Sequence, residues 1–254
     1  MLRTRVIPTL LLRNESLVKT VRFGKFTYVG DPCNTVRIFN ELEVDELVFL
    51  DITATKEKRQ PNFDLLADIA NECFMPLTYG GGVATFEQAQ RIFHIGFEKI
   101  SINNACVHDP QFVTRLSEYF GAQAVIASID VKKNLFGKYQ VMTLNGKESI
   151  SKDPVEWAQE LEKLGAGEIL LTSIDCEGTW QGFDLELVRT VADAVDIPVI
   201  AQGGAGTIDH IGDVVKQGNA SAVALGSMVT FQKQHMGVLI NFPDQNALAI
   251  ALDK

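Results

Sequence analysis

Short apolar runs alternate with segments of helical periodicity along the whole chain. The runs predict strands at residues 5–12, 46–52, 75–80, 98–103, 124–131, 168–174, 197–202 and 221–226. Between them, apolar residues recur at spacings of three and four, which predicts helices that include residues 35–43, 86–96, 154–165 and 184–195. Eight β-then-α units in 254 residues favour a closed (β/α)8 TIM barrel. An open doubly wound sheet is the alternative, but no glycine-rich loop follows the first run.

The two halves of the chain resemble each other. ELVFLDIT (46–53) precedes EILLTSID (168–175) by 122 residues, and YGGG (79–82) precedes QGGA (202–205) by 123. At a similar offset Leu11 falls opposite Asp130. We therefore expect residues 1–254 to form one α/β barrel of two similar half-barrels. A small hairpin insertion is expected at about 133–149, where Asn145-Gly146 is a turn signal.

The composition argues against several classes of function. A net charge of −9 argues against nucleic acid as a partner, and no apolar run reaches the roughly 18 residues of a membrane span. The scattered cysteines and histidines predict neither a disulfide framework nor a metal site. A cytoplasmic protein without a metal or cofactor is expected, although a local basic patch could bind a phosphorylated metabolite.

Glycines and small polar residues follow the predicted strands, at the end where barrel enzymes place their sites. The candidates in the first half are Gly81, Gly82, Asn103 and Asn104, and those in the second half are Gly178, Gly203, Gly204, Gly226 and Ser227. Exposed backbone N–H groups in such turns bind anions, so the repeated set predicts two phosphate sites on opposite sides of the rim. The alternative is that the glycines only permit tight turns.

Carboxylates also lie at these strand ends: Asp51, Asp130, Asp175 and Glu177. Asp130 closes an apolar strand, and partial burial would raise its pKa toward neutrality, as a general acid or base requires. A hydrogen-bonded loop anchor is the alternative. Cys176 is a weak candidate nucleophile because no histidine lies nearby in the sequence.

Charged residues begin four of the predicted strands: Arg5, Glu46, Lys99 and Glu168. They are either solvated strand ends or a ring of two cations and two anions across the barrel axis. A ring inside the barrel would be tolerable only if the charges paired with one another.

These motifs together resemble the cyclase subunit of imidazole glycerol phosphate synthase. The resemblance runs from Met1 to about residue 230 through DELVFLDITA, GGGV, KISINNA, GAGEILLTSID, EGT and GGAG, in that order. It implies a glutaminase docked on the N-terminal face of the barrel and ammonia that travels through it, with Arg5, Glu46, Lys99 and Glu168 at the gate positions. Lys19, in the loop after the first strand, matches a substrate-loop lysine, and Gly82, Asn103, Gly204 and Ser227 match phosphate-site positions.

One position departs from that family. Its catalytic pair is an aspartate at the end of strand 1 and another at the end of strand 5. Asp130 supplies the second, but Leu11 replaces the first. Leucine cannot transfer a proton, and loss of an essential acid or base typically costs a factor of about 100–10,000.

A branch of the family is more similar. RVIPTLLL, DVKKNLFGKY and GVLINFP resemble cyclase-like proteins of bacterial surface-polysaccharide clusters, which are linked to acetamidino groups on nucleotide-activated sugars. This resemblance implies a glutaminase partner, a third amidotransferase-like protein and a phosphorylated or nucleotide-sugar ligand. Three hypotheses stay open: an ammonia-using subunit for acetamidino sugar formation, a genuine cyclase that tolerates Leu11, and a non-catalytic activator of the glutaminase.

Overall fold

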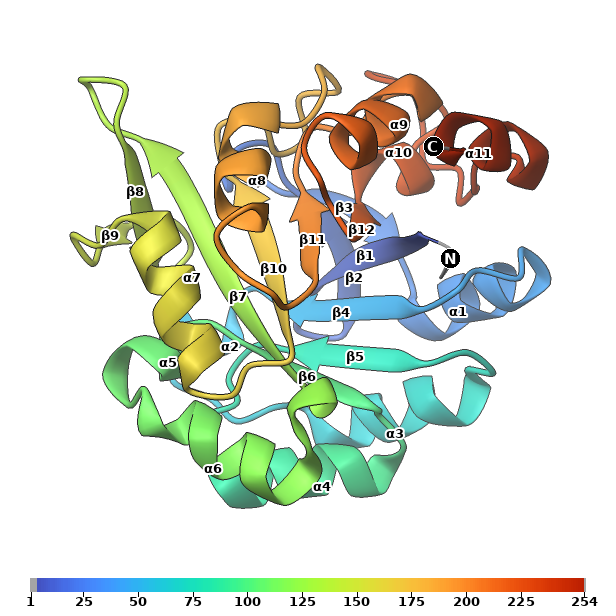
Figure 1. The fold of residues 1–254 in the computed structure, drawn as a ribbon. Helices are drawn as coiled ribbons and strands as arrows, with labels where there is room; N and C mark the ends of the chain where they lie inside the picture. Colours follow the sequence, from blue (N-terminus) through green and yellow to red (C-terminus); the bar gives the residue numbers. More distant parts are fainter. Residues whose placement is uncertain (1–3, 254) are drawn as a thin grey trace.

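A ring of parallel strands forms the centre of the molecule (Figure 1). The computed structural model describes residues 4–253. Within that range the eight barrel strands are β1 (Arg5–Arg13), β4 (Leu47–Asp51), β5 (Leu77–Gly80), β6 (Lys99–Ile102), β7 (Val125–Lys133), β10 (Glu168–Ser173), β11 (Val199–Gln202) and β12 (Ala222–Leu225). Each pairs in parallel with the next, and the pairing of β12 with β1 closes the ring. The predicted (β/α)8 TIM barrel is confirmed.

Helices cover the outside of the ring (Figure 1). In the described residues they are α1 (Pro32–Glu41), α2 (Ala54–Glu57), α3 (Phe63–Glu72), α4 (Phe86–Ile95), α5 (Asn104–His108), α6 (Gln111–Phe120), α7 (Pro154–Lys163), α8 (Leu185–Ala192), α9 (Ile208–Lys216), α10 (Ser227–Thr230) and α11 (Gln245–Leu252), with a 3-10 turn at Ala122–Ala124. Local chemistry fixes their ends. Asp153, for example, accepts from the backbone N–H groups of Val155 and Glu156, and Pro154 occupies the first turn of α7.

Two hydrophobic clusters result from the alternation of side chains along each strand. The larger cluster fills the space between strands and helices and includes Leu10 and Leu12 of β1. The smaller one lies inside the barrel and includes Ile7 of β1, Ile126 of β7 and Leu170 of β10. Arg5, Ile7, Thr9 and Leu11 therefore share the face of β1 that points along the barrel axis, and Asp130 shares the face of Ile126 on β7.

Two hairpins project from the strand ends. In the first, β2 (Ser16–Lys19) pairs antiparallel with β1, and β3 (Thr27–Gly30) pairs with β2. In the second, β7 continues past the rim to pair with β8 (Tyr139–Thr143), which pairs with β9 (Glu148–Ser149). Asn145 and Gly146 take positive φ in the turn between β8 and β9.

The assignment of Lys19 to a loop is wrong. Lys19 is the last residue of β2, with 4% of its surface exposed. The physical reason is that Leu17 and Val18 pair with Leu12 and Leu11 of β1, and both are buried there. In the described part of the chain, no helix has the length and apolar character needed to cross a membrane.

Candidate functional site

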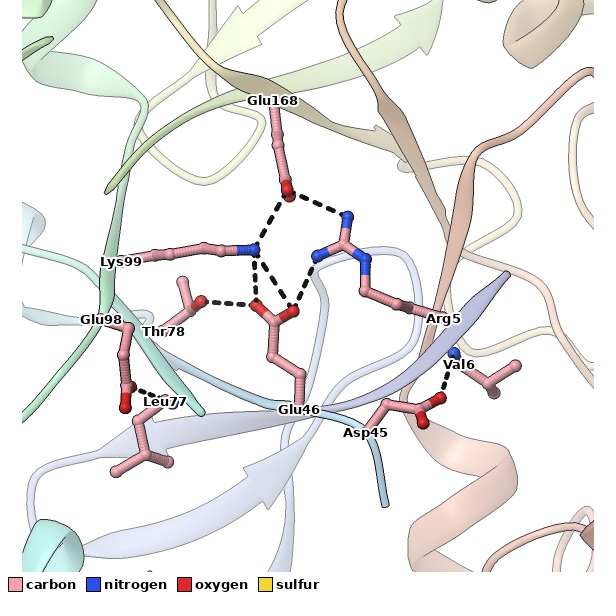
Figure 2. Close-up of polar contacts among 9 residues, drawn as sticks. All are labelled: Arg5, Val6, Asp45, Glu46, Leu77, Thr78, Glu98, Lys99 and Glu168. Carbon is pink, nitrogen blue, oxygen red and sulfur yellow. Dashed lines mark hydrogen bonds and ion pairs between the residues drawn. The ribbon is translucent and has the colours of Figure 1, made fainter. Parts of the chain in front are cut away.

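At the N-terminal end of the barrel, Arg5, Glu46, Lys99 and Glu168 form one closed ring of ion pairs, shown in Figure 2. Arg5 contacts Glu46 at 2.8 Å and Glu168 at 3.0 Å. Lys99 contacts the same two carboxylates at 3.3 and 3.1 Å. Arg5, Lys99 and Glu168 are the first residues of β1, β6 and β10, and Glu46 directly precedes β4, so the ring spans the barrel axis. Below, these four side chains are called the charge ring.

The charge ring is largely buried, and its charges compensate one another. Burial acts to lower the pKa of Arg5, but the carboxylates of Glu168 and Glu46 outweigh it and raise that pKa overall. The Thr78 hydroxyl donates a further hydrogen bond to Glu46 (3.0 Å). Because each cation has two anionic neighbours, the arrangement meets the condition that ionic groups inside a protein be mutually paired.

Above the charge ring, the barrel interior changes from apolar to polar. The first layer is the inner cluster around Ile7 and Ile126. Beyond it the buried Thr9 Oγ1, Ser101 Oγ and Gln202 Oε1 have no hydrogen-bond partner among the described residues. Such atoms commonly bind a small polar molecule such as water. The interior therefore offers acceptors between the charge ring and the C-terminal end.

A cavity of about 750 Å³ opens at the C-terminal end of the barrel. Leu11 and Asp130 both line it, together with Asn103, Glu177 and Gln202. Leu11 and Asp130, which are equivalent positions of the internal repeat, therefore lie at one site. The apolar side chain of Leu11 occupies the position opposite the Asp130 carboxyl group. Leu11 is 6% exposed.

Asp130 lies in an environment that favours its protonated form. Burial raises its pKa to about 7, although hydrogen bonds from Thr172 and Asn103 act in the opposite direction. Asn103 Nδ2 is 3.1 Å from Asp130 Oδ2 and also donates to the Ser128 carbonyl. A carboxyl group with a pKa near neutrality can both accept and donate a proton, which is what a general acid or base does.

The first-half candidates surround this cavity. Gly81, Gly82, Asn103, Asn104 and Asp51 all line it. Asp51 is engaged by its own loop: it accepts from the backbone N–H groups of Thr53 and Ala54 and pairs with Arg59 at 2.9 Å. Gly81 has a φ of +112°, and a Cβ there would lie 2.3 Å from the Asp51 carbonyl oxygen, so this glycine is required for the turn.

Most of the second-half candidates do not line this cavity. Of the described residues that line the cavity, those that follow the hairpin after β7 are Thr172, Glu177 and Gln202, which leaves out Asp175, Gly178, Gly203, Gly204, Gly226 and Ser227. The Gly182 N–H donates to the Gly204 carbonyl (2.8 Å). Asp175 accepts from the Lys133 backbone N–H (2.8 Å). The two glycine sets are therefore similar in sequence, but only the first-half set lines the cavity.

Cys176 is half-buried, and burial raises the pKa of its thiol. A raised pKa lowers the thiolate fraction, so this side chain stays a weak candidate nucleophile.

Five basic residues at the cavity were not among the candidates predicted from the strand ends. Arg13, Lys56, Lys58, Arg59 and Lys147 line it. Three of them belong to the run TKEKRQ directly after the strand that ends in Asp51. A basic run in a loop at the C-terminal end of a barrel strand is a signal for an anionic ligand, and the sequence contains that signal.

The protein is therefore a (β/α)8 barrel with a titratable carboxyl group at the C-terminal end of its strands, which is where enzymes of this fold have their active sites. The model of the histidine biosynthesis protein family matches residues 5–235. The chain belongs to this family, which confirms the resemblance at the family level.

Named relatives align over nearly the whole chain. A protein of Pseudomonas aeruginosa, provisionally named imidazole glycerol phosphate synthase subunit HisF2, is 49% identical over 98% of this chain and 100% of its own length. The provisional subunit HisF3 of Vibrio vulnificus is 45% identical over 100% of this chain and 98% of its own length. A provisional HisF subunit of Leptospira borgpetersenii is 43% identical, covering 96% of both chains.

Proposed function

We propose that this protein is the ammonia-using synthase subunit of a glutamine amidotransferase complex. A glutaminase docks on the N-terminal face, and its ammonia passes the charge ring and the barrel interior to the cavity at Asp130. There it supplies the nitrogen of an acetamidino group on a nucleotide-activated sugar for surface polysaccharide. A third, amidotransferase-like protein takes part in the same conversion.

The observation that carries this proposal is the alignment of three features along one axis. The charge ring lies at one end, and a cavity lined by Asp130, a carboxyl group with a near-neutral pKa, lies at the other. Between them lie three buried oxygens that have no hydrogen-bond partner among the described residues. Ammonia donates hydrogen bonds readily, so the oxygens of Thr9, Ser101 and Gln202 suit its passage. A scaffold that only activates a glutaminase needs neither the interior acceptors nor the cavity.

Leu11 favours amidine formation over imidazole ring closure. Conversion of an amide to an amidine consumes ammonia and releases water, and one group that donates and accepts protons can assist both changes. Asp130 fits that role, since its pKa is raised to about 7. Ring closure in the resembling family uses a second carboxylate at the position of Leu11.

The names of the relatives favour a second candidate, a genuine cyclase subunit of imidazole glycerol phosphate synthase. The two functions separate in a strain that lacks its histidine-pathway cyclase. We expect the wild-type protein not to support growth without histidine. Leu11→Asp should restore a trace of growth. Leu11→Asn should not, because asparagine has the shape of aspartate but cannot carry its charge. Growth with the wild-type protein would establish the cyclase and contradict the acetamidino proposal.

The glutaminase is tested separately. Glutamine hydrolysis by the glutaminase encoded beside this protein should rise when this protein is added. If the two proteins do not co-purify and hydrolysis is not stimulated, the proposed complex is ruled out. Stimulation without transfer of amide ¹⁵N from glutamine to any small-molecule product would instead identify a non-catalytic activator.

A further inference from the structure

The hairpin inserted after β7 contributes one buried hydroxyl to the C-terminal end of the barrel. Thr143 is the last residue of β8, and 4% of its surface is exposed. Its neighbour Met142 pairs with Asp130 of β7, so the register of the hairpin brings Thr143 close to that aspartate. Thr143 is not among the described residues that line the cavity. It therefore acts on the site only through another side chain.

The Thr143 hydroxyl contacts the side-chain oxygens of the two asparagines that follow β6. Thr143 Oγ1 donates to Asn104 Oδ1 at 2.8 Å and lies 3.5 Å from Asn103 Oδ1. A threonine has a single hydroxyl proton, so the two amide oxygens share one donor. Among the described residues, no other group donates a hydrogen bond to either oxygen. Thr143 thus holds both amides at their oxygen ends.

The nitrogen end of Asn103 contacts two acceptors. Its Nδ2 donates to the Ser128 carbonyl oxygen and to Asp130 Oδ2, both at 3.1 Å. An amide has its donors on nitrogen and its acceptor on oxygen, so the reversed orientation would bring the amide oxygen against the Ser128 carbonyl oxygen. With a donor at one end and two acceptors at the other, Asn103 fits its surroundings in one orientation.

This orientation matters for Asp130, because a hydrogen bond from Asn103 stabilises the ionised carboxylate. Burial is the larger influence and raises the Asp130 pKa to about 7, and the Asn103 hydrogen bond acts against that rise. Without the Thr143 hydroxyl, Asn103 Oδ1 would have no donor in the described part of the chain. The amide would then be free to turn toward the open cavity, and its hydrogen bond to Asp130 would weaken.

The hairpin fixes the hydroxyl through contacts on both sides of Thr143. Before it, β8 pairs with β7 from Tyr139 to Met142. After it, the Lys147 backbone N–H donates to the Thr143 carbonyl oxygen (3.1 Å). The Asn145 side chain in the same turn donates to the Ile52 carbonyl oxygen, in the loop after β4. The turn is therefore attached to the barrel at a second place, and Thr143 lies between the two attachments.

We propose that Thr143 is a positioning residue for Asp130: its hydroxyl holds the oxygen ends of Asn103 and Asn104, which keeps the Asn103 NH₂ group on the Asp130 carboxyl group. The hairpin after β7 is then a part of the site and not only an insertion beside it. This inference rests on the proposed function in taking Asp130 as the group that transfers protons. Thr143 acts through Asn103 and is not itself an acid or a base.

The Asp130 pKa is the measurement, because a threonine with a merely structural role would not change it. It is followed by ¹³C NMR titration of the aspartate carboxyl carbons, with the Asp130 signal assigned by its absence in Asp130→Asn. Thr143→Val keeps the side-chain shape and removes the hydroxyl, whereas Thr143→Ser keeps the hydroxyl. Thr114→Val is the matched control, since it removes a hydroxyl hydrogen bond of 2.9 Å, to the Leu164 carbonyl oxygen, on a helix that does not contribute that residue to the cavity.

Thr143→Val should raise the Asp130 pKa by about 0.5 to 1, which is part of the rise of about 1 to 2 expected when a hydrogen bond to a charged group is lost entirely. The pKa rises because the ionised form loses a donor. Thr143→Ser and Thr114→Val should titrate as wild type. Hydrogen exchange of the Asn103 side-chain NH₂ group, measured in ¹⁵N spectra, should be faster in Thr143→Val and unchanged in Thr143→Ser.

The proposal is overturned if the Asp130 pKa in Thr143→Val is unchanged or falls, or if Thr143→Ser shifts it as much as Thr143→Val does. If Thr143→Val does not fold, Thr143→Ala removes the same hydroxyl without a bulky replacement, and the same outcomes decide. These titrations use neither glutaminase nor sugar, so their result is separate from that of the proposed function. An active complex that contains Asp130→Asn would refute the proton-transfer role and leave the effect of Thr143 on the Asp130 pKa intact.

Discussion

The two ends of the barrel treat buried charge in opposite ways. At the N-terminal end, the charge ring pairs two cations with two anions inside a single network. At the C-terminal end, Asp130 and Lys19 make no ion pair in the described part of the chain, and burial shifts the pKa of each toward its neutral form. At one end the buried charges compensate one another, and at the other they do not.

This difference separates a structural element from a reactive one. A paired charge inside a protein is neutralised by its neighbours and has little tendency to exchange protons or bind a ligand. A buried charge without a pair can lower its free energy by binding an ion or transferring a proton, which is why perturbed pKa values gather at functional sites. Substitutions at the two ends should therefore have opposite effects on stability.

The largest effect is expected on activity at the C-terminal end. Asp130→Asn keeps the shape of the side chain and removes its ability to exchange a proton, so activity should fall by about 100–10,000-fold. The measurement is transfer of amide ¹⁵N from glutamine to product in the complete complex. Asp68→Asn, at an exposed position of α3, should behave as wild type. Activity within tenfold of wild type would remove Asp130 from the proton-transfer role.

A substitution in the charge ring at the N-terminal end should lower the stability of the protein. Glu46→Gln leaves Arg5 and Lys99 with one carboxylate between them, and removal of one partner of a buried pair costs about 3–5 kcal/mol. The free energy of unfolding in urea measures this loss. Glu41→Gln, at an exposed glutamate of α1, should change it by less than about 0.5 kcal/mol. A loss in Glu46→Gln no larger than in the control would mean that the ring contributes nothing to stability.

Asp130→Asn should raise the free energy of unfolding, which Glu46→Gln lowers, and the size of the increase should depend on pH. Burial raises the Asp130 pKa to about 7, whereas an unfolded chain has an aspartate pKa near about 3.9. Between these values the folded state binds more protons, so wild-type stability falls as pH rises from about 4 to 7. Asp130→Asn avoids that loss.

The comparison is a pair of urea titrations. At pH 8 the variant should be more stable than wild type by at most about 4 kcal/mol, and at pH 4 the two should nearly coincide. Equal stabilities at both values would show that the carboxyl group of Asp130 is not perturbed by burial.

The amino-acid sequence was sufficient to predict the features that depend on strand order. Parallel strands bring their starts to one end of the barrel, and this rule groups Arg5, Glu46, Lys99 and Glu168. The same rule places Asp130 opposite Leu11 at the C-terminal end. The apolar runs and the internal repeat give the end of the barrel at which each residue lies. They left open whether the four charges form a ring or are solvated strand ends, and the gate assignment came from the family resemblance.

The contacts made by the turn after β10 could not be predicted in this way. Thr20 and Phe23 donate hydrogen bonds to the Glu177 carboxylate, and the chain carries no periodic pattern that links these two parts. The strand β2 is only four residues long and exists because it pairs with β1, so local sequence preference alone places Lys19 in a loop. Non-local pairing overrides that preference in short strands.

The smallest expected effect comes from Lys19. Lys19→Met keeps a long flexible side chain, removes the buried ammonium and should stabilise the protein at neutral pH. The sign follows from the lowered pKa: below it both states are protonated, and the folded state carries the full cost of the buried charge. A gain on the order of 1 kcal/mol is usual when a functional site loses a strained group. Lys25→Met, at an exposed lysine, should leave the free energy of unfolding in urea unchanged. If Lys19→Met instead lowers stability, the ammonium has a paired, structural role, and the two ends of the barrel are more alike than their contacts indicate.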